Sequence, residues 1–243
     1  MCRMLGVISK KPELVSAWLQ ALEAQATKGN HHPHGDGYGA AYYDFGALHL
    51  RHEVRPIWER TPIFRGDETG TCLVMHARKA SKGATVLDNV QPFYARSDDY
   101  KLVFCHNGTV RDIERLAGSH EYLEKGLSDS AVIFHRLIDS LPFYDDLPAC
   151  MTALVAEIEG QCQSKTSLNA LFSNGSSLGA LRSCYTEEDY YTLYVGKTED
   201  HAVVSTERFG TYEWRLIPNH TLWIIGEGHE RYIELDAILS NDA

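Results

Sequence analysis

The sequence contains no long apolar run. Its first apolar segment, residues 4–8, is followed by Lys10 and Lys11. A secretory signal needs a longer apolar core, and a membrane-spanning helix needs about 18 consecutive apolar residues. We therefore expect a soluble, cytoplasmic protein with no membrane segment.

The sequence also has no excess of positive charge. Its formal net charge is −10 at pH 7. Nucleic-acid-binding proteins present a basic face, and anionic membrane surfaces attract basic segments. The charge therefore argues against both kinds of partner and is explained by solubility alone.

Metal-binding signatures are missing as well. None of the six cysteines forms a C-x-x-C pair, so neither a zinc knuckle nor a redox motif is indicated. A cytosolic chain keeps such cysteines as reduced thiols. Histidines are more plentiful, but no H-E-x-x-H signature accompanies them. We expect no metal and no cofactor. The loop histidines His31, His32 and His34 are expected to line the rim of a cleft.

No linker divides the chain, since Gly/Ser runs, Pro-rich stretches, blocks of like charge and internal repeats are all absent. We expect one domain over residues 1–243, a length that can bury a sizeable core. Apolar periodicity predicts four helices. The first opens at residues 11–13, and the others span residues 112–117, 128–140 and 147–159. The same criterion, with turn residues between segments, predicts strands over residues 2–8, 38–43, 47–51, 71–76, 101–106, 168–172, 178–184, 191–195, 202–205 and 222–225. Strands at both ends with helices between them favour antiparallel sheets covered by helices.

The most informative residue is Cys2, which directly follows Met1. Removal of Met1 would give a mature chain of residues 2–243, with a thiol and a free α-amine on the same residue. An N-terminal amine titrates near pH ~8 and can act as the base that activates a nucleophile. The alternative is that Cys2 is a small packed residue at the start of a buried strand.

Polar clusters lie at the ends of several predicted strands, where side chains can converge. Each has a purely structural interpretation: Asn107-Gly108 as a turn, Arg78 with Lys79 as an exposed basic face, Ser128-Asp129 as a helix cap, and Asp36 as a turn residue. The clusters are His34-Gly35-Asp36-Gly37-Tyr38-Gly39, His76-Ala77-Arg78-Lys79-Ala80-Ser81, Cys105-His106-Asn107-Gly108-Thr109 and Leu127-Ser128-Asp129-Ser130.

Taken in order, these clusters resemble the class II glutamine amidotransferases, which are N-terminal-nucleophile hydrolases. The order is Cys at position 2, H-x-R-x-A-S, H-N-G and S-D-S. The chain is most similar to the stand-alone form of the family, and the later segments Val204–Glu207 and Trp214 resemble it too. The resemblance implies an α+β (mixed α/β) fold: a four-layer αββα sandwich of two antiparallel sheets.

The resemblance also implies roles for single residues. Cys2 would attack the γ-amide of glutamine, and Asn107 and Gly108 would hold the oxyanion. Arg78 would bind the α-carboxylate and Asp129 the α-ammonium of the substrate. His76 and Asp36 would contribute to the substrate site.

The expected reaction is hydrolysis of a γ-glutamyl amide through a Cys2 thioester, with release of glutamate and of ammonia or an amine. An ammonia-accepting synthase would be the partner of a transferase. Three alternatives remain: a dedicated hydrolase of γ-glutamyl conjugates or peptides, a non-catalytic ligand-binding domain of the same fold, and an N-terminal-cysteine amidase acting on other acyl amides.

Overall fold

The computed structural model describes residues 2–59, 66–81, 83–97, 100–226 and 228–235. Two sheets are formed within them, and every pairing between neighbouring strands is antiparallel. The first sheet has the order β11 (Arg215–Leu216), β9 (Tyr194–Lys197), β10 (His201–Ser205), β1 (Arg3–Leu14), β4 (Thr69–Ala77), β2 (Tyr38–Asp44) and β3 (Ala47–Glu53). The second has the order β13 (His229–Glu234), β12 (Thr221–Gly226), β8 (Ser177–Arg182), β7 (Asn169–Ser173), β6 (Lys101–Asn107) and β5 (Phe93–Arg96).

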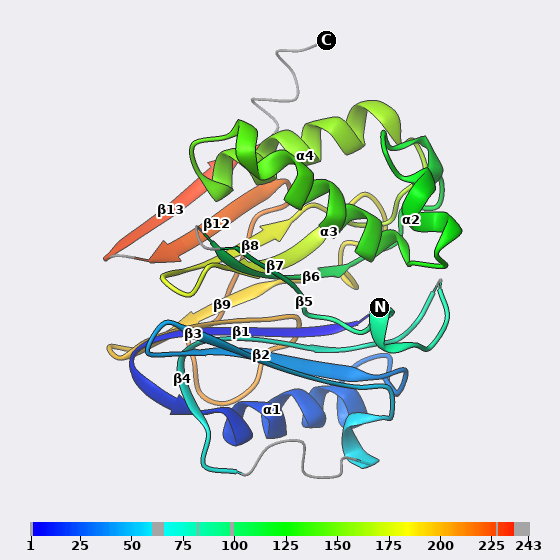
Figure 1. The fold of residues 1–243 in the computed structure, drawn as a ribbon. Coiled ribbons are helices and arrows are strands. Elements are labelled where there is room, and N and C mark those ends of the chain that lie inside the picture. Colours follow the sequence, from blue (N-terminus) through cyan, green and yellow to red (C-terminus); the bar gives the residue numbers. More distant parts are fainter. Residues whose placement is uncertain (1, 60–65, 82, 98–99, 227, 236–243) are drawn as a thin grey trace.

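Helices cover the outer faces of the two stacked sheets (Figure 1). Helix α1 (Val15–Lys28) lies on the first sheet, and α3 (Asp129–Ser140) and α4 (Leu147–Gln161) lie on the second. The short helix α2 (His120–Glu124) precedes α3, and single 3₁₀ turns span Ile57–Glu59, Leu87–Asn89, Ile113–Arg115 and Leu141–Phe143. The expected four-layer αββα architecture is therefore confirmed.

Three apolar clusters lie between the four layers of helices and sheets. Alternation along β1 explains the first two, because successive side chains of a strand point to opposite faces. Leu5 and Val7 pack with α1, whereas Met4 packs between the sheets. The third cluster joins the second sheet to α3 and α4. Both faces of each sheet are thus buried over most of its area, which fixes the register of the strands.

The helices of the second covering layer begin at side-chain caps. Ser128 Oγ accepts a hydrogen bond from the Ala131 N–H at 3.3 Å, and Asp146 Oδ1 accepts one from the Ala149 N–H at 2.7 Å. Each cap satisfies one of the free N–H groups of the first helical turn. The interpretation of Ser128 as a helix cap is confirmed.

Most predicted elements are present, with shifted boundaries. The first strand continues through the residues predicted to open a helix, and α1 begins only at Val15. The helix predicted over 112–117 is a single 3₁₀ turn, because the backbone becomes extended at Leu116. The strand predicted over 191–195 is β9, which begins at Tyr194. Four elements were not predicted: the strands β5, β11 and β13, which lie at sheet edges, and the short helix α2.

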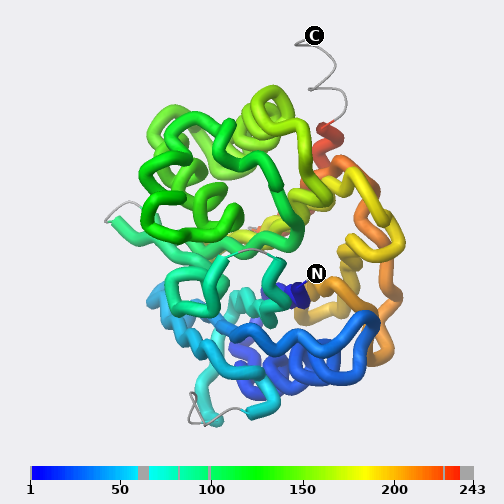
Figure 2. The backbone as a smooth tube through the Cα atoms, turned by 90° about the vertical axis from the view of Figure 1, so that its right-hand side faces the viewer, coloured from blue at the N-terminus to red at the C-terminus, as the bar shows by residue number. Residues whose placement is uncertain are grey.

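Strand pairing brings the polar clusters to one end of the sandwich. Arg3 pairs with Ala77, so the start of β1 lies beside the end of β4. Strand β6 ends at Asn107 in the facing sheet, and α3 begins just behind it. Figure 2 looks onto this end of the molecule, with the start of the chain between the two helical layers. None of the helices in the described residues is long and apolar enough to cross a membrane.

Candidate active site

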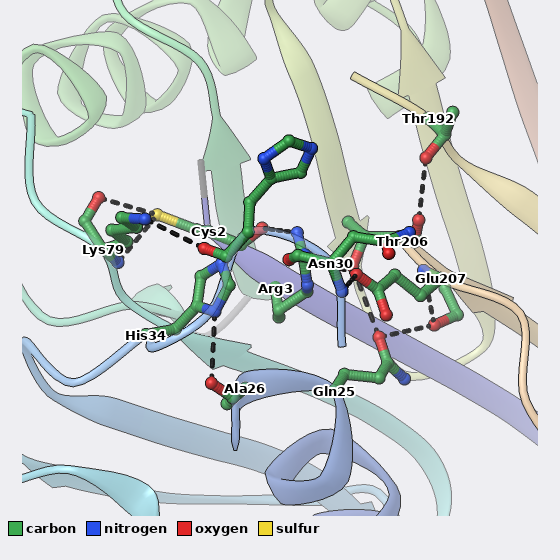
Figure 3. A network of polar contacts seen from close by, with 12 residues as sticks. Cys2, Arg3, Gln25, Ala26, Asn30, His34, Lys79, Thr192, Thr206 and Glu207 are labelled. Atoms are coloured by element: carbon green, nitrogen blue, oxygen red, sulfur yellow. Dashed lines mark hydrogen bonds and ion pairs between the residues drawn. The ribbon is translucent and has the colours of Figure 1, made fainter. Parts of the chain in front are cut away.

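Cys2 lies partly buried between the two sheets, where the Asn107 side chain and the Lys79 main chain contact it. Figure 3 shows the contact with Lys79. The Cys2 backbone nitrogen donates a hydrogen bond to Asn107 Oδ1 at 2.9 Å, which links the first sheet to the second. The Lys79 N–H lies 3.5 Å from Cys2 Sγ and donates to it, and the Lys79 carbonyl oxygen lies 3.7 Å from the same sulfur. The sulfur is thus fixed at the loop that follows β4.

Burial raises the pKa of the Cys2 thiol, and the Lys79 N–H and the Arg78 guanidinium act in the opposite direction. The net effect is a thiol that stays protonated at neutral pH. A thiol is a weak nucleophile compared with a thiolate, so this cysteine needs a base that takes its proton during attack.

The two ends of the Asn107 side-chain amide have different surroundings. Its Oδ1 accepts from the Cys2 nitrogen, while its Nδ2 is buried and has no hydrogen-bond partner among the described residues. A buried donor without a partner is costly, which points to a ligand that accepts from it. Asn107 itself is fully buried, so the orientation of this donor is set by the surrounding strands.

Gly108 follows Asn107 where the chain leaves β6. A Cβ atom at this position would lie 1.8 Å from the Ser167 carbonyl oxygen and 2.6 Å from the Ser167 carbonyl carbon. Only glycine fits against backbone at such a distance. Asn107-Gly108 is therefore a close-packed strand end, in addition to any turn preference of the two residues.

Arg78 is buried, with 3% of its surface exposed, so its interpretation as an exposed basic face was wrong. Its Nη2 donates to the Gly83 carbonyl at 3.3 Å. Its main chain pairs with the loop before β2, donating to Gly37 O at 2.8 Å and accepting from Asp36 N at 3.0 Å. The Asp36 carboxylate accepts from the Ala80 N–H at 2.8 Å, so Asp36 fixes the loop that carries Arg78 and Lys79.

Asp129 is the first residue of α3, and 5% of its surface is exposed. One carboxylate oxygen, Oδ2, accepts from the Val110 N–H at 2.8 Å. The positive end of the helix dipole favours a carboxylate at this position. The Asp129 carboxyl group therefore lies in the cavity wall, at the start of α3.

His106 is a buried neutral residue of the same wall. Burial lowers its pKa although the Asp129 carboxylate acts in the opposite direction. Its Nε2 faces the Ser167 carbonyl at 3.1 Å and its Nδ1 faces Ser130 Oγ at 2.8 Å. A carbonyl only accepts, so Nε2 carries the proton and Nδ1 accepts from the Ser130 hydroxyl. His106 thereby connects the end of β6 to the start of α3.

These groups surround a cavity of about 60 Å³. Larger cavities of about 710 Å³ and about 470 Å³ lie elsewhere, but neither contains the clustered residues. The wall of the small cavity includes five residues predicted for the site and others that were not. It is lined by Cys2, Arg78, Lys79, Ala80, Ser81, Gln91, His106, Asn107, Gly108, Thr109, Ser128, Asp129, Ser130 and Tyr191.

Two predicted site residues lie outside that wall. Asp36 holds the neighbouring loop, as described above. His76 is fully buried on β4, and neither ring nitrogen has a hydrogen-bond partner among the described residues. Burial lowers the pKa of His76 well below its ordinary value, so the ring is neutral. Direct contact of Asp36 and His76 with a substrate stays a prediction.

The main-chain role of Lys79 and the contributions of Gln91 and Tyr191 were not predicted from the sequence. Gln91 Oε1 accepts from the His106 N–H at 2.6 Å. Tyr191 donates through its hydroxyl to Thr166 Oγ1 at 2.8 Å. Only Lys79 had a signal, since it lies inside the cluster that begins at His76. Among the described residues, no group of histidine, cysteine and acidic side chains is placed to bind a metal ion.

Comparison with known proteins adds an independent line of evidence. The family model of class-II glutamine amidotransferases matches residues 1–195. The protein MJ1515 of Methanocaldococcus jannaschii is 24% identical over 218 residues, which cover 86% of this chain and 56% of that protein. The protein YafJ of Escherichia coli K12 is 23% identical over 182 residues, which cover 72% of this chain and 70% of YafJ.

Solved structures share the fold. Glutamine phosphoribosylpyrophosphate amidotransferase from B. subtilis matches with a TM-score of 0.72 at 18% identity, over 96% of this chain and 49% of that one. A glutamine aminotransferase class-II domain protein from Silicibacter pomeroyi matches with a TM-score of 0.68 at 20% identity, over 96% and 99% of the two chains. The chain therefore spans about half the length of the B. subtilis enzyme and of MJ1515.

The family match covers more than half of the chain and includes the residues of the cavity wall up to Tyr191. Its fold is the two-sheet sandwich of the amidotransferases to which it is structurally similar. This chain belongs to the class II glutamine amidotransferases.

Proposed function

We propose that the protein hydrolyses the γ-amide of glutamine or of a γ-glutamyl compound through a thioester on Cys2. The observation that carries this proposal is the geometry of Asn107, which accepts from the Cys2 nitrogen and leaves a buried donor unpaired beside the nucleophile. Removal of Met1 would turn that same nitrogen into the α-amine of the mature chain.

The reaction would begin with attack of Cys2 Sγ on the γ-carbonyl carbon. The α-amine, directly or through a water, takes the thiol proton and passes it to the leaving nitrogen, which departs as ammonia or an amine. Asn107 Nδ2 and the Gly108 N–H stabilise the negative oxygen of the tetrahedral intermediate. A water then attacks the thioester carbonyl, glutamate leaves, and the thiol regains its proton.

The charged end of a γ-glutamyl group has two partners in the cavity wall. Arg78 suits the α-carboxylate because a guanidinium can pair with both carboxylate oxygens. Asp129 suits the α-ammonium. Since either charge alone would be costly to bury, the two residues together favour γ-glutamyl substrates over simple acyl amides.

A panel of amides tests this proposal. Glutamine, γ-glutamyl peptides, γ-glutamyl amines and an acyl amide without the amino-acid end are assayed for glutamate, for ammonia and for the free acyl product. We expect release from the γ-glutamyl compounds only. Equal turnover of the simple acyl amide would contradict the proposal. Ammonia from glutamine alone would favour a transferase with a synthase partner, and preference for a conjugate would favour a dedicated hydrolase.

Arg78→Ala should raise KM for the best γ-glutamyl substrate. A hydrogen bond to a charged group contributes about 1.5–3 kcal/mol, so KM should rise roughly 10- to 100-fold. Initial rates over a range of substrate concentrations measure the effect. Arg96→Ala is the matched control, because Arg96 is exposed on β5. An Arg78→Ala KM equal to that of the control would reject the carboxylate-binding role.

A further inference from the structure

The residue next to the nucleophile is a buried arginine. Arg3 is 1% exposed, and it forms an ion pair with Glu207, whose side chain is 17% exposed. Burying a guanidinium is costly unless its charge is paired and its N–H groups are hydrogen-bonded. A buried charged pair is thus next to Cys2, although apolar residues of similar size could fill the same space without the cost of burying charge.

The arginine makes contacts that include the main chain of the nucleophile itself. Arg3 Nη1 donates to the Cys2 carbonyl oxygen at 3.4 Å, and Nη2 donates to both the Asn30 carbonyl and Glu207 Oε1. The same carboxylate oxygen accepts from the Asn30 N–H at 2.7 Å. Figure 3 shows Cys2, Arg3, Asn30 and Glu207 joined in this way.

Glu207 approaches from a well-fixed segment. It follows Thr206, which runs beside β1: the Thr206 N–H donates to the Met4 carbonyl at 3.1 Å, and Thr206 Oγ1 accepts from the Met4 N–H at 3.3 Å. Ser205 Oγ donates to Gln25 Oε1 of α1 at 3.1 Å. The segment Val204–Glu207, part of the family resemblance in the sequence, is therefore tied to the first residues of β1 and to α1.

The charges of Arg3 and Glu207 act on the Cys2 thiol. Burial lowers the pKa of Arg3, and Glu207 acts in the opposite direction, as does the Cys2 thiolate. The interaction is mutual, so the positive charge of Arg3 favours the thiolate form of Cys2. Glu207 moderates that charge. The pair can therefore set both the position and the charge environment of residue 2.

We propose that the Arg3–Glu207 ion pair positions the nucleophile: it holds Cys2 by its carbonyl oxygen while Asn107 holds it by its nitrogen. Arg3 and Glu207 are positioning residues, since neither lines the cavity within the described residues. The inference rests on the proposed function only for its kinetic consequence. A misplacement of about 1 Å at a reacting group can cost roughly 100-fold in rate.

Glu207→Gln tests the proposal, because glutamine keeps the shape and the accepting oxygen but removes the charge. We expect kcat to fall about 10- to 100-fold, with KM changed less than about threefold, since Arg78 and Asp129 are untouched. Glu157→Gln is the matched control: Glu157 pairs with Arg136 at 2.9 Å between α4 and α3, away from the cavity. Thermal unfolding of both variants measures the loss of stability that is common to them.

Alkylation of Cys2 by iodoacetamide, followed by peptide mass spectrometry over a range of pH, is a readout that a purely structural role would not move. In Glu207→Gln the midpoint of this profile should move to lower pH, because Arg3 acts on the thiolate without its counter-charge. Arg3→Lys keeps a positive charge but loses the planar fork of donors. It should lower kcat and leave the midpoint within error of the unmodified protein.

Two results would overturn the proposal: a kcat in Glu207→Gln that matches Glu157→Gln, or an alkylation midpoint that Glu207→Gln does not move. If Glu207→Gln fails to fold, the kcat of Arg3→Lys decides in the same way. If the unmodified protein turns over no γ-glutamyl compound, the proposed function fails while the alkylation profile still tests the action of Glu207 on Cys2.

Discussion

Cys2→Ala should abolish the release of glutamate from γ-glutamyl substrates. Alanine removes the only atom that can form the thioester, so kcat should fall by at least ~10⁴-fold, as loss of a nucleophile does in other covalent enzymes. The fold should persist, because Cys2 is partly exposed and its backbone nitrogen still donates to Asn107. A coupled assay for glutamate, run at enzyme concentrations high enough to detect the residual rate, measures the loss.

Cys162→Ala is the control for this prediction. Cys162 is a free cysteine at the end of α4, buried in the core layer between that helix and the second sheet. Its replacement should lower stability but leave turnover per folded molecule unchanged. Residual activity of Cys2→Ala within tenfold of the Cys162→Ala value would remove Cys2 from the mechanism.

Asn107→Asp should cause the second largest loss. Aspartate keeps the oxygen that accepts from the Cys2 nitrogen, but it replaces the unpaired Nδ2 donor by an oxygen. The oxyanion would lose one donor and face a second acceptor. Loss of one such donor costs about 2.7–4 kcal/mol of transition-state stabilisation, so kcat should fall roughly 100- to 1000-fold with a much smaller change in KM. Steady-state kinetics on the best substrate separates the two parameters.

Asn219→Asp controls for the general effect of this substitution. Asn219 also uses both ends of its amide, accepting from the Cys184 N–H and donating to the Cys184 carbonyl, each at 2.8 Å, away from the cavity. It should leave kcat near the unmodified value. If Asn107→Asp did the same, the unpaired donor would have no part in catalysis.

Much of the fold was predictable because the apolar residues of its strands and helices follow patterns that the sequence shows. Strands β1, β4 and β6 have side chains that face a helix on one side and the other sheet on the opposite side. Strands β4 and β6 were predicted within about two residues at each end, and β1 was predicted over its first half. Elements that depend on long-range pairing were not. Strand β13 carries exposed polar residues and exists because it pairs with β12 at the sheet edge.

The site was predictable where a side chain does the chemistry and less so where the main chain does. Cys2, Arg78, Asn107, Gly108 and Asp129 all line one cavity, as the order of their motifs suggested. The N–H of Lys79 contacts the sulfur. Every residue except proline has such an N–H, so the residue type does not show which one will make the contact.

Other roles were missed because their partners lie far along the chain. Arg3 and Glu207 are 204 positions apart. No local pattern predicts that they meet, or that the first of them contacts the carbonyl of the nucleophile. The Asp36 carboxylate likewise accepts from the N–H of Ala80, 44 positions away, and the assignment of Asp36 to the substrate site stays a prediction.

The most direct test of the central claim is a search for the acyl-enzyme itself. The protein is mixed with the γ-glutamyl compound that it turns over fastest, quenched in acid within the first turnovers, and analysed by intact and peptide mass spectrometry. We predict one glutamyl adduct, in thioester linkage, on a Cys2 that has become the first residue of the chain. Turnover without any such adduct, or a chain that keeps Met1 while fully active, would contradict the account.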